Sequence, residues 1–112
     1  MVMECRETVA RFFGIEDAGR IAFTANATEA INLGLFGALS PGDRVVTTSM
    51  EHNAVVRPLQ ALSNKGVNVV RVMADADGSV APAAIREACL PGTRMLVMNH
   101  CSNVTGTLQP IE

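Results

Sequence analysis

Residues 44–73 read RVVTTSMEHNAVVRPLQALSNKGVNVVRVM, and this stretch decides the fold. It opens with a β-branched run at 44–48 that is typical of a buried strand. Apolar residues at helical spacing then predict an amphipathic helix over 55–64, whose regular part should begin at Pro58. A second β-branched run at 67–73 predicts another strand. A strand, a helix and a strand in this order predict two parallel strands joined by a right-handed crossover.

The rest of the chain repeats this alternation. Helical spacing or composition predicts further helices over 2–13, 30–38 and 82–89, and short apolar runs predict strands over 20–24 and 94–98. The 30–38 helix is apolar on nearly all sides, so we expect most of it to be buried. We therefore predict an α/β fold with three α/β/α layers around a mainly parallel sheet, and ligands at the carboxyl ends of its strands.

Composition narrows the class of protein. The chain has 112 residues, 48% of them apolar and 18% charged, which excludes a disordered tail and allows one domain at most. A formal net charge of -2, no Trp or Tyr and only four Phe argue against a nucleic-acid partner. No apolar run predicts a membrane helix, and the first residues lack the apolar centre of a signal peptide. We expect a cytoplasmic protein.

Three cysteines, Cys5, Cys89 and Cys101, are odd in number and scattered along the chain. This pattern fits neither a disulfide framework nor a CxxC metal site, so we expect reduced thiols in the core or close to it. His52 and His100 follow different predicted strands and have no evident third ligand. We therefore predict no metal site.

A strand-to-helix junction at residues 24–29 reads TANATE. The free N–H groups of Ala27, Thr28 and Glu29 at a helix start, together with the positive end of the helix dipole, would suit a phosphate. Asn26 and Glu29 also form the pattern of a capping box, which could use the same donors within the helix. Both interpretations remain open from this segment alone.

Two further segments follow predicted strands and would reach the same edge of the sheet. Met50-Glu51-His52-Asn53 brings an imidazole there, and Asn99 to Gly106 brings several amides. Taken singly, His52 is more simply a structural or solvated histidine, and the amides of the second segment are as well explained as loop caps. Together with the helix start, they would place an anion-binding site, an imidazole ring and an amide at one edge of the sheet.

These segments, in this order, resemble the class V aminotransferase family of pyridoxal-phosphate enzymes, and within it the cysteine desulfurase and selenocysteine lyase branch. The resemblance covers nearly the whole chain. FTANATEAINL at 23–33 resembles the phosphate-binding strand and helix of the family, GDRVV to MEHN at 42–53 its second unit, and NHCSNVTGT at 99–107 its fourth strand and loop.

The resemblance implies a role for four residues. Ala27 and Thr28 would bind the phosphate of pyridoxal phosphate, His52 would stack on its pyridine ring, and Asn103 would approach the ring hydroxyl. The family often has Gly-Thr-Thr or Gly-Ala-Thr where this chain has Asn26-Ala27-Thr28. One hydroxyl contact to the phosphate is therefore absent, and Asn26 would cap the helix.

The resemblance also implies that residues 1–112 are a single partial domain, the N-terminal half of the large domain of the enzyme. Such an enzyme attaches its cofactor through a lysine. The only lysine here, Lys65, precedes the 67–73 strand and so belongs at the opposite edge of the sheet from His52. We therefore assign no catalytic residue and expect the chain alone to be inactive. The complete enzyme would take sulfur from L-cysteine, giving alanine, as a homo-oligomer.

Three alternatives remain at this stage. The chain could be part of a class V aminotransferase with another amino-acid substrate, or a non-catalytic module that keeps the anion site or an assembly surface. A nucleotide-binding α/β domain is disfavoured because neither a GxGxxG loop nor a Walker lysine motif is present.

Overall fold

The computed structural model describes residues 1–111, which separate into two compact units. The first is Met1–Ala30, and the second begins at Ile31. The boundary falls inside helix α2 (Ala27–Ala38), so the first turn of this helix belongs to the first unit and the remainder to the second.

The first unit starts with helix α1 (Val2–Phe13), as its sequence pattern predicted. Gly14 ends the helix in the left-handed conformation, with a φ of 67°, and its N–H donates to the last carbonyls of the helix. A glycine adopts this conformation without the steric cost that a side chain would bring. Gly14 therefore fixes the C-terminal end of α1.

The strand predicted over residues 20–24 is wrong. Ala18–Arg20 form a short 3-10 helix, and the residues from 21 to 24 have no regular structure. Asp17 caps this turn, because its Oδ1 accepts the N–H of Gly19 at 2.8 Å. A strand needs a neighbour for its backbone hydrogen bonds, and within residues 1–111 no strand pairs with this segment, so Phe23 remains half exposed.

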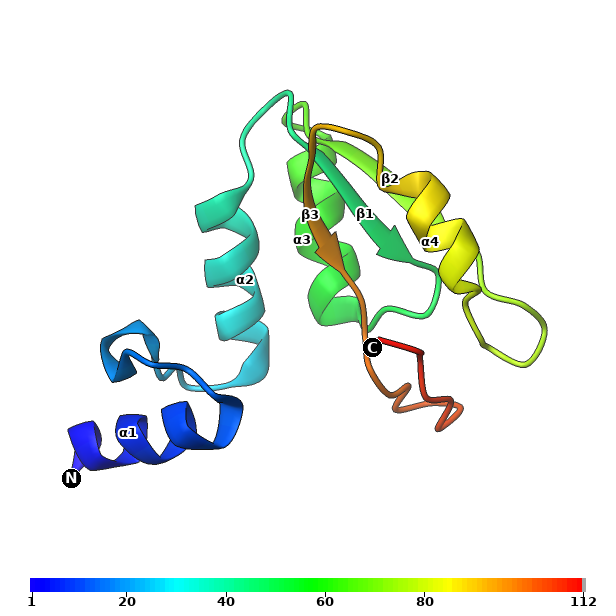
Figure 1. The fold of residues 1–112 in the computed structure, drawn as a ribbon. Helices are drawn as coiled ribbons and strands as arrows, with labels where there is room; N and C mark the ends of the chain where they lie inside the picture. Colours follow the sequence, from blue (N-terminus) through cyan, green and yellow to red (C-terminus); the bar gives the residue numbers. More distant parts are fainter. Residues whose placement is uncertain (112) are drawn as a thin grey trace. The chain divides into compact units, whose positions relative to one another are not determined.

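The second unit is built on a parallel sheet of three strands, which are β1 (Arg44–Thr48), β2 (Asn68–Val72) and β3 (Thr93–Val97). The order is β2-β1-β3, and β1 pairs in parallel with both neighbours (Figure 1). The predicted strand–helix–strand unit is therefore confirmed, as is the parallel pairing of its strands.

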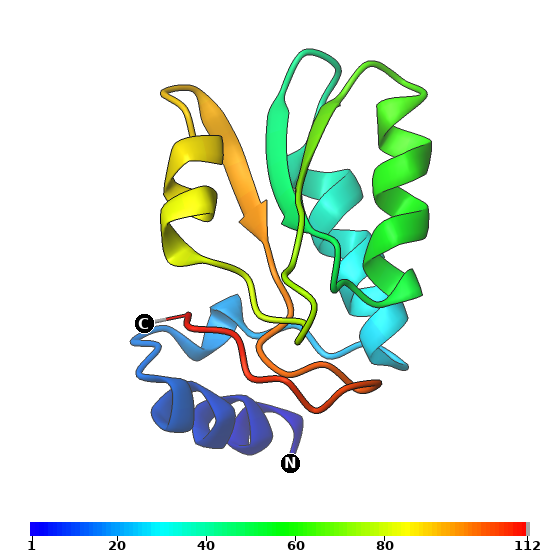
Figure 2. The same cartoon turned by 90° about the vertical axis from the view of Figure 1, so that its right-hand side faces the viewer.

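Helices cover both faces of this sheet (Figure 2). On one face, the part of α2 from Ile31 onward and α3 (Asn53–Ser63) enclose a core with Val45 of β1. On the other face, α4 (Pro82–Ala88) packs with Val46 of β1. Adjacent residues of a strand point to opposite faces, so β1 contributes to both cores. The three-layer α/β/α prediction is confirmed.

Two details of the helices differ from the predictions. In α2 only Leu35 is buried, while Leu33 and Phe36 are exposed, because the described residues cover one side of this apolar helix. Helix α3 starts at residue 53 and contains Pro58 in its interior. Proline has no N–H to donate within the helix, which is destabilising. A cap at the N-terminus and the buried face that includes Leu59 compensate for this lost hydrogen bond.

Candidate functional site

The start of α2 forms the capping box that its sequence allowed. The Glu29 N–H donates to Asn26 Oδ1 at 2.9 Å, and the Ala25 N–H donates to Glu29 Oε2 at 2.9 Å. The Thr24 hydroxyl also donates to the carbonyl of Asn26. Of the two interpretations that the sequence left open, the Glu29 N–H follows the capping box, because Asn26 accepts from this donor.

Ala27 and Thr28 occupy the first turn of α2 in the first unit, and both are exposed. The positive end of the helix dipole lies at this turn, which favours an anion there. His52 and Asn103 belong to the second unit. Binding of one cofactor by all four residues therefore stays a prediction.

The carboxyl ends of β1 and β3 meet at one edge of the sheet in the second unit, since the strands are parallel neighbours. Glu51 connects the two ends. Its Oε1 accepts the hydroxyl of Thr48 at 2.6 Å and the N–H of Asn99 at 3.1 Å. The segments that carry His52 and Asn103 both start at this connection.

His52 caps helix α3. Its Nδ1 accepts the N–H of Ala54 at 3.0 Å, and this hydrogen bond holds the plane of the imidazole. The other ring nitrogen, Nε2, takes no part in the cap. The side chain is otherwise exposed. The sequence predicted the imidazole of His52 at this edge of the sheet. The hydrogen bond that caps α3 was not predicted and is seen in the structure.

A cavity of about 250 Å³ lies at this edge of the second unit. Its wall combines aliphatic side chains with polar groups from both strand ends; the lining residues are Ile31, Glu51, His52, Val55, Val97, Met98, Asn99 and His100. An apolar wall with a few polar groups is the usual character of a site for a small organic ligand. His52 therefore lines a concave surface.

Asn103 lies at the exposed tip of a loop that follows β3. Ser102 organises this loop, because its Oγ accepts the N–H groups of Val104 and Thr105. Gly106 closes the turn with a φ of 72° and donates its N–H to the carbonyl of Ser102. The loop therefore presents Asn103 from an ordered turn.

Gln109 holds this loop against the turn that precedes α4, and no sequence pattern predicted this role. Its side chain is buried, with 3% exposed. Oε1 accepts the N–H of Val80 at 3.0 Å, and Nε2 donates to the carbonyl of Gly78 at 2.7 Å. Thr107 adds a bond from its hydroxyl to the carbonyl of Asp77. These partners lie about thirty residues apart in the chain, so no local pattern indicates the contacts.

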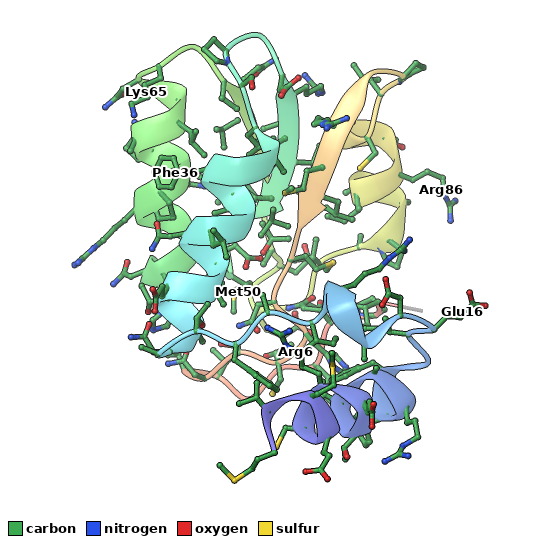
Figure 3. All side chains as sticks on the ribbon, turned by 90° about the vertical axis from the view of Figure 1, so that its left-hand side faces the viewer. Arg6, Glu16, Phe36, Met50, Lys65 and Arg86 are labelled. Carbon is green, nitrogen blue, oxygen red and sulfur yellow. The ribbon has the colours of Figure 1, made fainter. Side chains whose placement is uncertain are left out.

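Lys65 lies at the other end of the sheet, as predicted. It follows α3 and precedes β2, whose first residue Asn68 pairs with Arg44, the first residue of β1. Its Nζ lies 5.6 Å from the centre of the Phe36 ring. Figure 3 shows Lys65 near Phe36 at one end of the unit and Met50 at the other.

Within residues 1–111 no three His, Cys, Asp or Glu side chains are grouped as metal ligands, and no helix has the length and apolar character needed to cross a bilayer. Cys5, Cys89 and Cys101 are all unpaired thiols. Cys89 is partly buried, but Cys5 and Cys101 are exposed, so the predicted core location is wrong for these two.

A family model described as aminotransferase class-V matches residues 1–112. The chain belongs to this family. Probable cysteine desulfurases from Mycolicibacterium paratuberculosis and Vibrio cholerae are each 36% identical to it and cover 97% and 96% of the chain. The chain spans only 17% and 28% of the length of these two relatives.

A solved structure of SspA in complex with cysteine is also similar, with a TM-score of 0.87 and 30% identity. The match covers 99% of this chain and 33% of the SspA chain. The predicted resemblance to the class V family, and the similarity to cysteine desulfurases within it, are therefore confirmed.

Proposed function

We propose that this chain forms the phosphate-binding and ring-binding part of a pyridoxal-phosphate-dependent cysteine desulfurase. The observation that carries the proposal is the cavity at the carboxyl ends of β1 and β3, which His52 lines. Family membership and the names of the relatives support the reaction class.

The residues present fit the cofactor. Aliphatic side chains, including Val55 and Val97, line the cavity and suit the faces of a pyridine ring. His52, with its ring plane held by Ala54, would stack on the pyridine ring, and Asn103 would donate to the ring hydroxyl. Ala27 and Thr28 would bind the phosphate at the start of α2.

The cofactor, when bound, supplies an electron sink for negative charge at the α-carbon of an amino acid. The described residues of this chain would bind the cofactor and orient its ring. Lys65, the only lysine, lies at the end of the sheet opposite His52 and contacts Phe36. We therefore propose that residues 1–112 produce no alanine from cysteine by themselves, and that no catalytic residue lies among them.

The proposal extends to the substrate, the oligomeric state and the cellular location. L-cysteine is proposed as the substrate of the complete enzyme because the two relatives are named cysteine desulfurases and SspA was solved with cysteine. A homodimer would cover exposed apolar side chains such as Leu33 and Leu96. Three unpaired cysteines support a reducing, cytoplasmic location.

Binding of pyridoxine 5′-phosphate tests the proposal, because this analogue lacks the aldehyde and cannot react with Lys65 or the N-terminus. We expect fluorescence titration of the 112-residue chain to show binding that is stronger than that of pyridoxine and weakened by His52→Ala. Lys65→Ala is the control and should leave binding unchanged. Preferential binding of ATP, or no selectivity for the pyridine ring over inorganic phosphate, would contradict the proposal and favour a simple anion-binding module.

A further inference from the structure

Glu51 receives two hydrogen bonds on one oxygen, from groups that belong to different strand ends. The hydroxyl of Thr48, at the end of β1, donates to Oε1 at 2.6 Å, and the N–H of Asn99, just after β3, donates to the same atom at 3.1 Å. Thr48 is 1% exposed, so its hydroxyl depends on protein partners.

The Thr48 hydroxyl extends the connection. Its oxygen accepts the N–H of Met50 at 3.1 Å while its hydrogen goes to Glu51. The backbone before His52, the Thr48 side chain, the Glu51 carboxylate and the backbone at Asn99 therefore form one hydrogen-bonded chain. Hydrogen bonds to an ionised carboxylate are stronger than bonds between neutral groups, and linked bonds reinforce one another.

We propose that Glu51 is a positioning residue that sets the distance between the segment carrying His52 and the loop carrying Asn103. The inference rests on the proposed function, since it assigns those two residues to the cofactor ring. Glu51 lines the same cavity as His52, so a shift of its carboxylate would move both strand ends and change the width of the cavity.

Four substitutions separate the parts of this connection. Glu51→Ala removes the acceptor, whereas Glu51→Gln keeps an acceptor oxygen without the charge. Thr48→Val removes the hydroxyl with little change of shape, and Thr48→Ser restores it. Glu87→Ala, at an exposed position of α4, is the control for loss of a glutamate.

The first measurement is NMR of the 112-residue chain without ligand. We expect Glu51→Ala to raise the exchange rate of the Asn99 amide by about tenfold, as expected for loss of a protecting hydrogen bond, and to shift the ring resonances of His52. Thr48→Val should give a smaller change in the same direction, and Thr48→Ser and Glu87→Ala should resemble the wild type. The double variant Thr48→Val/Glu51→Ala should equal Glu51→Ala in the exchange rate of the Asn99 amide, because Thr48 acts on Asn99 through Glu51.

The second measurement is the affinity for pyridoxine 5′-phosphate, which should fall at least about fivefold in Glu51→Ala and recover in part in Glu51→Gln. Unchanged Asn99 exchange and His52 resonances in Glu51→Ala would overturn the inference. Circular dichroism checks folding, and if Glu51→Ala is unfolded, Glu51→Gln and Thr48→Val decide by the same criteria. If the wild type fails to bind the analogue, the proposed function fails, while the NMR result still decides the role of Glu51.

Discussion

His52 combines two tasks that substitutions can separate. Its Nδ1 accepts the N–H of Ala54 at the start of α3, and its ring lines the cavity. We expect His52→Ala to lower the free energy of unfolding by about 1 kcal/mol, which is typical for loss of a helix cap. His52→Asn should restore this stability because asparagine is a good cap, yet it should bind pyridoxine 5′-phosphate as poorly as His52→Ala. Urea denaturation and ligand titration measure the two effects. Equal stability of His52→Ala and the wild type would show that the cap contributes nothing.

Single residues differ in how far the sequence reveals their contacts. The capping box of Asn26 and Glu29 was predictable because both partners lie within one turn of helix. His52 was predictable as a residue at a strand end. The roles of Glu51 and Gln109 were not, because their partners are brought together only by the folded sheet.

At the scale of elements, hydrophobic periodicity located the three strands of the sheet. The predicted strands 44–48, 67–73 and 94–98 match β1, β2 and β3 to within one residue at each end. The pattern failed at 20–24, because an apolar run becomes a strand only when another strand supplies its hydrogen bonds. Periodicity reports which residues are apolar and carries no information on whether a partner strand exists.

The loop after β3 depends on Gln109, which joins it to the turn before α4. Gln109→Leu would leave the N–H of Val80 and the carbonyl of Gly78 without these partners. Because buried polar groups without partners are costly, we expect the free energy of unfolding to fall by about 2 to 4 kcal/mol for the two groups together. Gln109→Glu keeps an acceptor for Val80 but sets a buried carboxylate, which cannot donate, against the carbonyl of Gly78, so it should cost at least as much. Thermal unfolding measures both variants. A stability equal to that of the wild type in Gln109→Leu would contradict the role of Gln109 in joining the loop.

The turn at residues 75–79 should depend on pH through Asp77. The hydroxyl and the N–H of Ser79 donate to its carboxylate and lower the pKa of Asp77 below the ordinary value. A lowered folded pKa means that the stabilising effect is present above the unfolded pKa and is lost as pH falls through the folded one. We therefore expect the Ser79 amide to lose protection in acid, so that its hydrogen-exchange rate rises relative to the rate of an unprotected amide at the same pH. The NMR resonance of this amide should shift over the same pH range. In Asp77→Asn this titration should disappear; its persistence would assign the shift to another group.

The whole sheet unit has two cores that share one strand. Val45 and Val46 of β1 are fully buried and point into opposite cores, and Leu59 of α3 is 2% exposed in the first of them. Leu59→Ala should lower the free energy of unfolding by about 2 to 5 kcal/mol, through lost burial and a new cavity. Leu33→Ala, at an exposed site, is the control and should change it by less than about 0.5 kcal/mol.

The reach of the Leu59 substitution tests whether the two cores unfold together. Because β1 separates them and belongs to both, loss of the first core should also expose the second, although within residues 1–111 no apolar side chain of α4 packs against the first core. Hydrogen exchange of Leu59→Ala should therefore accelerate by similar factors in the slowest amides of β1, α3 and α4. Acceleration confined to α3 would mean that the α4 side is stable by itself. In that case, only local hydrogen bonds such as those of Glu51 would maintain the shape of the cavity at the ends of β1 and β3.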